Sequence, residues 1–205
     1  ILVPFCVESS LSGVQKRVGV DEALWYERSF KVPAKWRGNK ILLHFGAVDW
    51  KAEVWVNGIK VGEHTGGFTP FCFDITSALK RSGRQTLRIK VTDASDHSYQ
   101  PRGKQTLLPQ GIWYTPVTGI WQTVWVEFLP IVHLESFRVY PDAVNGKATL
   151  VVQLRGAAAL TVKASYEGKP MGEATVNCLG GHETIVLNLL EKHLWEVGQG
   201  RLYDL

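Results

Sequence analysis

The segment from Asp49 to Asp74 constrains the fold of this chain more than any other. Within it, Lys51–Val56 and Ile59–Glu63 are short runs rich in β-branched and aromatic residues, as strands are. The dipeptide Asn57-Gly58 between them suits a type I′ turn, because both central residues of that turn need a positive φ. The segment therefore predicts a β-hairpin, followed by a glycine-rich bend and another aromatic strand.

The same alternation with a period of two residues recurs along the chain, and helical signals are weak. Only Asp74–Lys80, capped by Asp74 or Thr76, and Leu189–Trp195 could each form a helical turn. Short strands separated by regularly spaced turn residues indicate an all-β sandwich. The expected strands before residue 130 are Leu24–Val32, Lys40–Phe45, Lys51–Val56, Ile59–Glu63, Phe71–Ile75, Thr86–Thr92 and Gln122–Phe128.

A domain boundary is expected at Leu129-Pro130, because proline cannot donate to a sheet ladder and the composition changes there. All but one of the eight tryptophans precede it. Beyond it, Asn145-Gly146 and Glu167-Gly168 supply hairpin turns. The expected strands are His133–Tyr140, Lys147–Leu154, Leu160–Tyr166, Glu173–Asn177 and Thr184–Leu189. The prediction is thus two domains, 1–129 and 130–205, with the second short of the roughly seven strands of an immunoglobulin-like sandwich.

Composition and charge narrow the function classes. The net charge of +4 is spread over single basic residues, which argues against nucleic acid as a partner. No apolar run approaches the roughly 20 residues of a membrane-spanning helix, so no membrane partner is expected. Cys6, Cys72 and Cys178 are odd in number and far apart, so they indicate neither a disulfide framework nor a metal site, and their redox state is left open. We expect Cys72 to be a buried, small apolar residue.

Several segments, in order, resemble glycoside hydrolase family 2, the family of β-galactosidases, β-glucuronidases and β-mannosidases. The matching segments are Leu24–Pro33, Ile41–Asp49, the Val56-Asn57-Gly58 hairpin, Gly119–Glu127, Leu194-Trp195 and Leu202–Leu205. The resemblance implies an all-β fold: a jelly-roll β-sandwich that binds sugar, followed by an immunoglobulin-like β-sandwich truncated at its C-terminus. It also implies that the chain is a fragment of a retaining exo-β-glycosidase.

In that family, two glutamates on a (β/α)₈ barrel carry out the hydrolysis. Nothing in this sequence alternates strands with long helices, so the barrel is expected to be missing and no catalytic residue is assigned. The resemblance implies no cofactor. The partners it implies are the barrel and, through the parent enzyme, a β-linked glycoside or oligosaccharide. The fragment should support the barrel, shape the sugar pocket and lack hydrolase activity. The resemblance does not determine where in the cell the protein is located, although a polysaccharide-degrading parent enzyme would suit a periplasmic or secreted location.

The loop Gln100–Thr118 is the best candidate for contact with substrate, because long loops in compact domains are usually functional. In the family, this loop reaches toward the active site and often carries an acidic residue six positions before the glycine of the Gly-Ile motif. Here that position is Trp113, followed by Tyr114. Two interpretations stay open: these aromatic rings stack on a sugar face, or they pack the loop or a domain interface.

Other candidates have structural alternatives. Glu8 lies in a segment that the resemblance places near the rim of the active site, where it would accept sugar hydroxyls, or else it is a solvated carboxylate. We expect the tryptophans of the strand regions to pack in the core, namely Trp25, Trp50, Trp55 and Trp125. Histidine spacing indicates no zinc site. Asp93, Asp96 and His97 suit a turn better than a calcium site, so no metal is predicted.

Two other functions compete with that of an enzyme fragment. A freestanding carbohydrate-binding module would expose a coplanar aromatic platform, and exposed aromatic patches mark binding sites. A structural or adhesive sandwich is also compatible with the fold, because fold alone does not specify function.

Overall fold

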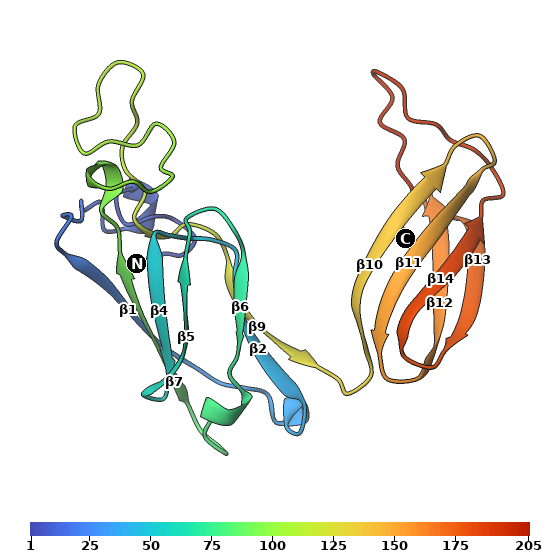
Figure 1. Ribbon diagram of the computed structural model, residues 1–205, viewed down its shortest axis with the longest axis horizontal. Coiled ribbons are helices and arrows are strands. Elements are labelled where there is room, and N and C mark those ends of the chain that lie inside the picture. The colour runs from blue at the N-terminus through green and yellow to red at the C-terminus, as the bar shows by residue number, and fades with distance from the viewer. The chain divides into compact units, whose positions relative to one another are not determined.

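The computed structural model describes residues 1–205, which form two compact units, Ile1–Leu129 and Pro130–Leu205 (Figure 1). The regular secondary structure of each is mainly antiparallel β-strand, as the sequence predicted. Helical structure is limited to four short 3₁₀ turns, Ser10–Ser12, Ala34–Trp36, Thr76–Ala78 and Ser95–His97. None of the helices has the length and apolar character that crossing a membrane requires.

Two larger sheets and one short strand pair make up the unit Ile1–Leu129. The four-stranded sheet has the order β1-β7-β4-β5, the three-stranded sheet the order β6-β2-β9, and β3 pairs with β8. Their bounds are β1 Ala23–Phe30, β2 Lys40–Phe45, β3 Val48–Asp49, β4 Lys51–Val56, β5 Ile59–Thr65, β6 Phe71–Asp74, β7 Gln85–Thr92, β8 Gly119–Ile120 and β9 Val124–Leu129. All seven expected strands are present, and β3 and β8 are additional.

The core of this unit lies between the two larger sheets. Every second residue of β2, β4 and β7 is buried, as a strand with one face toward a core requires. Phe45 at the end of β2 is the largest fully buried side chain, and its ring stacks on Phe71 with centroids 4.7 Å apart. Val54 and Val56 fill the facing positions on β4.

The predicted Asn57-Gly58 turn is confirmed, with φ of 51° and 84° at its two central residues. The Asn57 side chain also fixes the neighbouring loop. Its Nδ2 donates to the carbonyl oxygen of Ala78 at 2.8 Å and to Oε1 of Gln85 at 2.7 Å. Its Oδ1 accepts from the backbone N–H of Thr86 at 3.0 Å. This residue therefore joins the hairpin to β7 as well as closing it.

The prediction that the strand tryptophans fill the core is wrong. Trp50 and Trp55 are only half-buried and do not belong to the core cluster. Trp25 and Trp125 are 56% and 43% exposed. Both occupy outward positions, since their strand neighbours point to the core. On the outer faces, Trp25 stacks on Trp55 at 5.6 Å and Trp125 stacks on His44 at 4.8 Å. Cys72, also expected in the core, is exposed for the same reason.

One of the two expected helical turns is present. The 3₁₀ turn Thr76–Ala78 follows Asp74, whose Oδ1 accepts from the backbone N–H of Thr76 at 3.0 Å. The helical turn expected at Leu189–Trp195 is wrong. The backbone N–H groups of Leu189 and Leu190 there donate to distant carbonyl groups, which leaves no local helical ladder.

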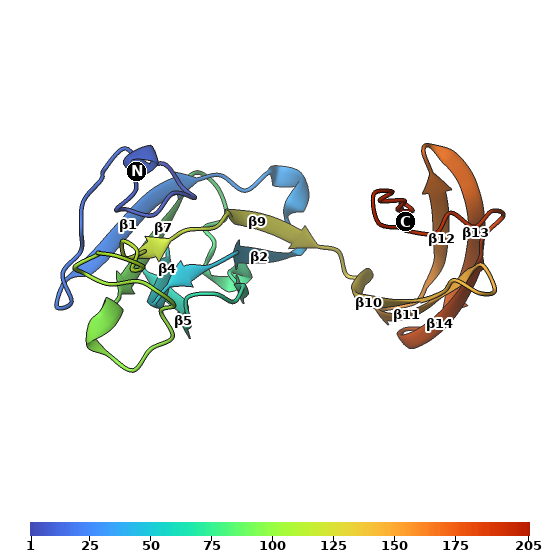
Figure 2. The same ribbon diagram turned by 90° about the horizontal axis from the view of Figure 1, so that it is seen from above.

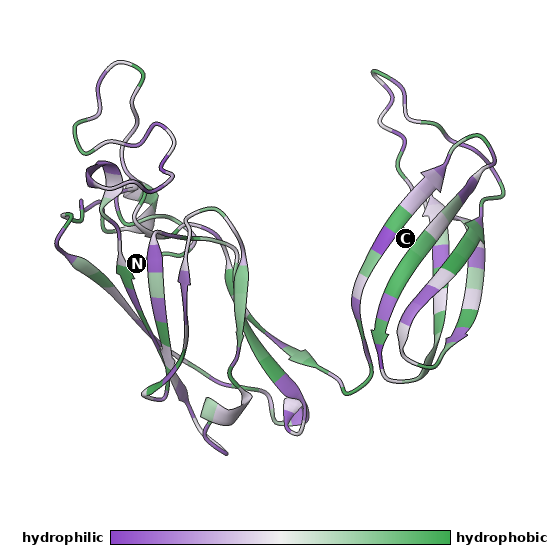
Figure 3. Ribbon diagram, viewed as in Figure 1, coloured by the Kyte–Doolittle hydropathy of each residue, from purple (hydrophilic) through white to green (hydrophobic).

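The unit Pro130–Leu205 contains a three-stranded sheet of order β10-β11-β14 and the pair β12-β13. These strands span β10 His133–Asp142, β11 Lys147–Arg155, β12 Ala158–Tyr166, β13 Lys169–Cys178 and β14 Gly181–Asn188. Figure 3 shows apolar and polar bands alternating along several of them, and Leu150, Val152 and Leu187 form the centre of a separate core. Glu167 and Gly168 both have positive φ, as a two-residue hairpin turn requires.

Candidate functional site

The loop from Ser98 to Thr118 projects beyond the ends of β1 and β4 and carries no helix or strand of its own (Figure 1). Such a loop holds one shape only if other residues fix it. Four carboxylates do so here: Glu8, Asp49, Asp93 and Asp96. They come from the N-terminal segment, from β3, and from the turn after β7.

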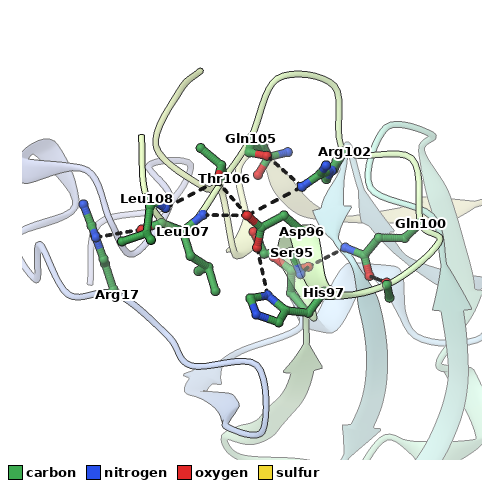
Figure 4. A network of polar contacts seen from close by, with 12 residues as sticks. Arg17, Ser95, Asp96, His97, Gln100, Arg102, Gln105, Thr106, Leu107 and Leu108 are labelled. Carbon is green, nitrogen blue, oxygen red and sulfur yellow. Dashed lines mark hydrogen bonds and ion pairs between the residues drawn. The ribbon is translucent and has the colours of Figure 1, made fainter. Parts of the chain in front are cut away.

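Asp96 fixes the middle of the loop (Figure 4). Its Oδ2 accepts from Oγ1 of Thr106 at 2.6 Å and from the backbone N–H of Leu107 at 3.2 Å, and lies 3.7 Å from the guanidinium of Arg102. Its Oδ1 lies 2.9 Å from Nδ1 of His97. Hydrogen bonds to a charged acceptor are the stronger ones, so this carboxylate is well suited to hold an otherwise irregular segment.

Asp93 fixes both ends of the loop. Its Oδ1 accepts from Nε2 of Gln100 at 2.5 Å and from the backbone N–H of Ser95 at 2.7 Å. Its Oδ2 accepts from Oγ1 of Thr118 at 3.0 Å. Asp93 and Thr118 are both buried. Through these bonds, residues near both ends of the loop are held by one side chain.

Asp49 lies beneath the loop and is only 2% exposed. Its Oδ2 accepts from Nε2 of Gln105 at 3.1 Å, and Oε1 of Gln105 in turn accepts from the backbone N–H of Val117. Its Oδ1 is buried without a hydrogen-bond partner. Gly67 packs so closely here that a β-carbon would overlap this carboxyl. Burial, together with the nearby charge of Asp93, raises the pKa of Asp49 to about 6.

Glu8 lies at the foot of the loop. Its Oε2 accepts from the backbone N–H of Thr118 at 3.1 Å, while its Oε1 is buried without a partner. Burial raises the pKa of this carboxyl above its usual range. The side chain is thus turned toward the loop backbone.

Trp113 and Tyr114 lie on the loop with side chains 42% and 65% exposed. Tyr114 is fixed by backbone bonds with Lys104 and Thr106, at 2.9 and 3.0 Å. The guanidinium of Arg102 lies 6.0 Å from the centre of the Trp113 ring, within the range of a cation–π contact. The two rings are exposed on a segment whose backbone is held, but they do not stack on each other.

The loop and its aromatic residues are visible in the sequence, but the anchors Asp49 and Gln105 are not. Asp49 directly follows the apolar run Gly46-Ala47-Val48. A charged residue is unusual in such a context unless it has a specific partner, and this is the feature of the sequence that points to Asp49. The turn predicted for the polar cluster of Asp93, Asp96 and His97 is confirmed by the 3₁₀ turn Ser95–His97. No three His, Cys, Asp or Glu side chains are arranged to hold a metal ion.

Replacing Asp96 with alanine should loosen the loop without unfolding the unit. The variant removes the acceptor of Thr106 and Leu107, so we expect limited proteolysis within residues 98–118 to become about tenfold faster, the effect of losing roughly 1.4 kcal/mol. Asp21→Ala is the matched control, because Asp21 is exposed and makes no hydrogen bond or ion pair. Equal cleavage rates in wild type and Asp96→Ala would show that the loop is held by other contacts.

The sequence of this chain is similar to that of known glycosidases. The family model described as "Glycosyl hydrolase 2 galactose-binding domain-like" matches residues 11–116. A β-galactosidase of Thermoanaerobacter pseudethanolicus is 37% identical over 114 residues, which are 55% of this chain and 14% of that protein. A β-glucuronidase of Paenibacillus borealis is 31% identical over 105 residues, which are 50% of this chain and 18% of that protein.

Solved structures match over almost the whole chain. The β-glucuronidase of Ruminococcus gnavus superimposes with a TM-score of 0.73 and 25% identity, covering 99% of this chain and 36% of that one. The β-sandwich architecture is thus that of family 2 enzymes, and the chain belongs to glycoside hydrolase family 2 through its galactose-binding-like domain. It spans less than a fifth of these two curated relatives and about a third of the structural one.

Proposed function

We propose that this chain is a non-catalytic part of a retaining exo-β-glycosidase, in which it supports a catalytic barrel and shapes the rim of the sugar pocket. The observation that carries the proposal is the loop Ser98–Thr118, which presents Trp113 and Tyr114 on a backbone held by four carboxylates. A site positioned in this way is preorganised, and binding then needs little further ordering. The relatives named β-galactosidase and β-glucuronidase support the substrate class, a β-linked glycoside.

In this proposal the jelly-roll domain is 1–129 and the immunoglobulin-like domain is 130–205. Trp113 and Tyr114 face the substrate, because sugar C–H groups pack well on aromatic rings. Glu8 contributes mainly through the loop. Its Oε2 already accepts from the backbone N–H of Thr118. The carboxylate therefore helps to fix the position of the loop backbone, and with it the position of the aromatic rings.

The test compares the 205-residue chain with the longer polypeptide that its gene encodes, using chromogenic β-galactoside, β-glucuronide and β-mannoside substrates. We expect turnover from the longer polypeptide alone. In that protein, Trp113→Ala should lower kcat/KM about tenfold, the loss of one stacking contact. Trp195→Ala, an equally drastic change at an exposed tryptophan of the other unit, should leave kcat/KM within about twofold.

Two results would contradict the proposal. Turnover by the 205-residue chain, absent from a mock preparation, would place catalysis in this piece. An unchanged kcat/KM for Trp113→Ala would remove the loop from the sugar pocket.

The exposure of Trp113 and Tyr114 favours one alternative, a carbohydrate-binding module that acts without a barrel. Such a module would bind oligosaccharide by itself. Calorimetry of the 205-residue chain with cello-, manno- and galacto-oligosaccharides at millimolar concentration distinguishes the two functions. Heat of binding that Trp113→Ala abolishes would favour the module, and no heat would favour the enzyme fragment.

A further inference from the structure

A pocket of about 390 Å³ lies at the end of the unit Ile1–Leu129 that is remote from the loop Ser98–Thr118. Its walls come mainly from two connections, residues 32–39 between β1 and β2 and residues 79–83 before β7. Figure 1 shows these connections at the lower end of the unit and the loop at its upper end, and Figure 2 shows the first of them where β1 leads into β2. The pocket is therefore separate from the candidate site.

Positive charge gathers in these two connections. Seven of the 23 lysines and arginines lie in the segments Lys31–Lys40 and Lys80–Arg84, which contain no aspartate or glutamate. The remaining 16 basic residues are outnumbered by the 19 acidic ones, so the net positive charge of the chain arises here. The carboxylate of Asp74 offsets part of it, because it lies 3.5 Å from Nζ of Lys40.

The charged side chains that line the pocket are all cationic: Arg37, Lys80 and Arg81. None of these three exposed side chains makes a hydrogen bond or an ion pair. On the outer face of the four-stranded sheet, by contrast, Lys60 and Arg88 are both paired with glutamates. A cleft lined by charges of one sign focuses their field and raises the local concentration of ions of the opposite sign. The pocket is thus suited to an anion.

The backbone that carries these cations is fixed on both sides of the pocket. Gln85 is only 2% exposed, and its Oε1 accepts from the backbone N–H of Lys80 at 2.8 Å. Its Nε2 donates to the carbonyl oxygen of Gly83 at 3.3 Å, which closes the loop between them. On the other side, the backbone N–H of Arg37 donates to the carbonyl oxygen of Ala34 at 3.2 Å. Cations on fixed backbone need little further ordering to bind a ligand.

The rest of the lining indicates which kind of anion fits. Trp36 lines the pocket, half-buried, with its ring centroid 5.2 Å from that of Phe128. An aromatic ring packs well against the C–H groups of a sugar, and guanidinium groups bind carboxylates or sulfates through paired hydrogen bonds. Single-stranded nucleic acid instead stacks successive bases on several aromatic side chains along a groove. One tryptophan beside three cations favours an acidic sugar.

We propose that this pocket binds an oligosaccharide that carries carboxylate or sulfate groups, at a second site distinct from the loop Ser98–Thr118. Arg37 and Arg81 bind the acidic groups, Lys80 adds to the positive field, and Trp36 packs against a sugar ring. The choice of a sugar over another anion rests partly on the proposed function, in which the chain belongs to a glycosidase. Such a site would hold an acidic polysaccharide while the loop contacts its reacting end.

Calorimetry of the 205-residue chain tests this assignment with three tetrasaccharides: tetragalacturonate, which carries only carboxylates, a κ-carrageenan fragment, which carries only sulfates, and neutral cellotetraose. We expect heat of binding from at least one acidic tetrasaccharide and none from cellotetraose. Because the cations are exposed, binding should weaken as salt is added. No heat from either acidic ligand would overturn the proposal. Sodium sulfate that binds as tightly as the sugars, or single-stranded DNA that binds more tightly, would overturn the sugar as the ligand.

A pair of double variants tests the pocket itself. Arg37→Ala combined with Arg81→Ala should weaken binding of the acidic tetrasaccharide at least about tenfold, through the loss of charge-assisted hydrogen bonds. Arg138→Ala combined with Lys169→Ala removes the same charge from exposed, unpaired positions of the other unit and should leave binding within about twofold. Equal weakening by both would overturn the pocket, because net charge alone would then explain the binding.

The indole N–H signal of Trp36 in NMR spectra is an independent readout. It is assigned by its loss in Trp36→Phe, and it should shift when the acidic tetrasaccharide binds. Binding without a shift of this signal would place the sugar elsewhere and overturn the proposal.

The outcomes separate this inference from the proposed function. Binding that depends on Arg37 and Arg81, in a chain whose longer polypeptide shows no glycosidase turnover, would support the pocket and contradict the enzyme. Turnover by the longer polypeptide without binding of acidic sugars at the pocket would do the reverse.

Discussion

Phe45→Ala is expected to lower the free energy of unfolding of the unit Ile1–Leu129 by about 3–5 kcal/mol, the range for truncating a buried phenylalanine. The Phe45 side chain is fully buried, and its ring contacts two others, Phe71 by stacking and Phe73 edge-on. Alanine would leave a cavity between the two sheets that neighbouring strands cannot fill without losing their pairing. Urea unfolding followed by tryptophan fluorescence measures the effect, because all but one of the eight tryptophans lie in this unit.

Phe68→Ala is the matched control for this substitution. Phe68 is more than half exposed, and its ring meets the edge of the Trp121 ring, with centroids 6.3 Å apart. Its loss should cost about 1 kcal/mol or less, as surface changes usually do. If both variants lost the same stability, the core would not lie between the sheets at Phe45.

The stability of the same unit should fall as the pH rises from about 4 to 7. The pKa of Asp49 is raised from 3.8 to about 6 in the folded chain, so between these values the folded state holds a proton that the unfolded state releases. The unfolding free energy therefore decreases through this window, by about 2 kcal/mol after allowance for solvent screening. Urea unfolding at half-unit pH intervals measures the decrease.

Asp49→Asn should remove most of that pH dependence, because the amide does not ionise. Its carbonyl oxygen can still accept from Gln105, which keeps the loop contact. Glu8→Gln should remove a smaller part, since the raised pKa of Glu8 acts in the same direction. A wild-type stability that is flat from pH 4 to 7, or an Asp49→Asn variant with the wild-type slope, would show that Asp49 does not ionise inside the fold.

Much of the fold could be predicted because its local signals agree with its tertiary structure. The Asn57-Gly58 turn required two positive φ values, and few other dipeptides provide them so readily. Alternation located every long strand of both units to within a few residues. It did not locate β3 and β8, because strands of two residues are too short to show a period.

The alternation of residue types along a strand does not by itself show which face of that strand points to the core. Trp25 and Tyr26 are adjacent, large and aromatic, and only the pairing of β1 with β7 decides that Tyr26 faces the core while Trp25 stacks on the outer face. In the candidate site, too, the residues were visible in the sequence but their contacts were not. Trp113 and Tyr114 were visible as aromatic residues in a long loop, but their support by Asp49 and Glu8 joins residues 56 and 110 positions apart.

The sequence by itself determined the fold class, the hairpin and the family, since these depend on residue types at short, regular spacings. The tertiary structure alone decided which faces are buried and how four carboxylates hold one loop. Those features arise when strands distant in sequence come together, and burial then gives a carboxylate such as Asp49 a pKa and a partner that its neighbours in the chain do not specify.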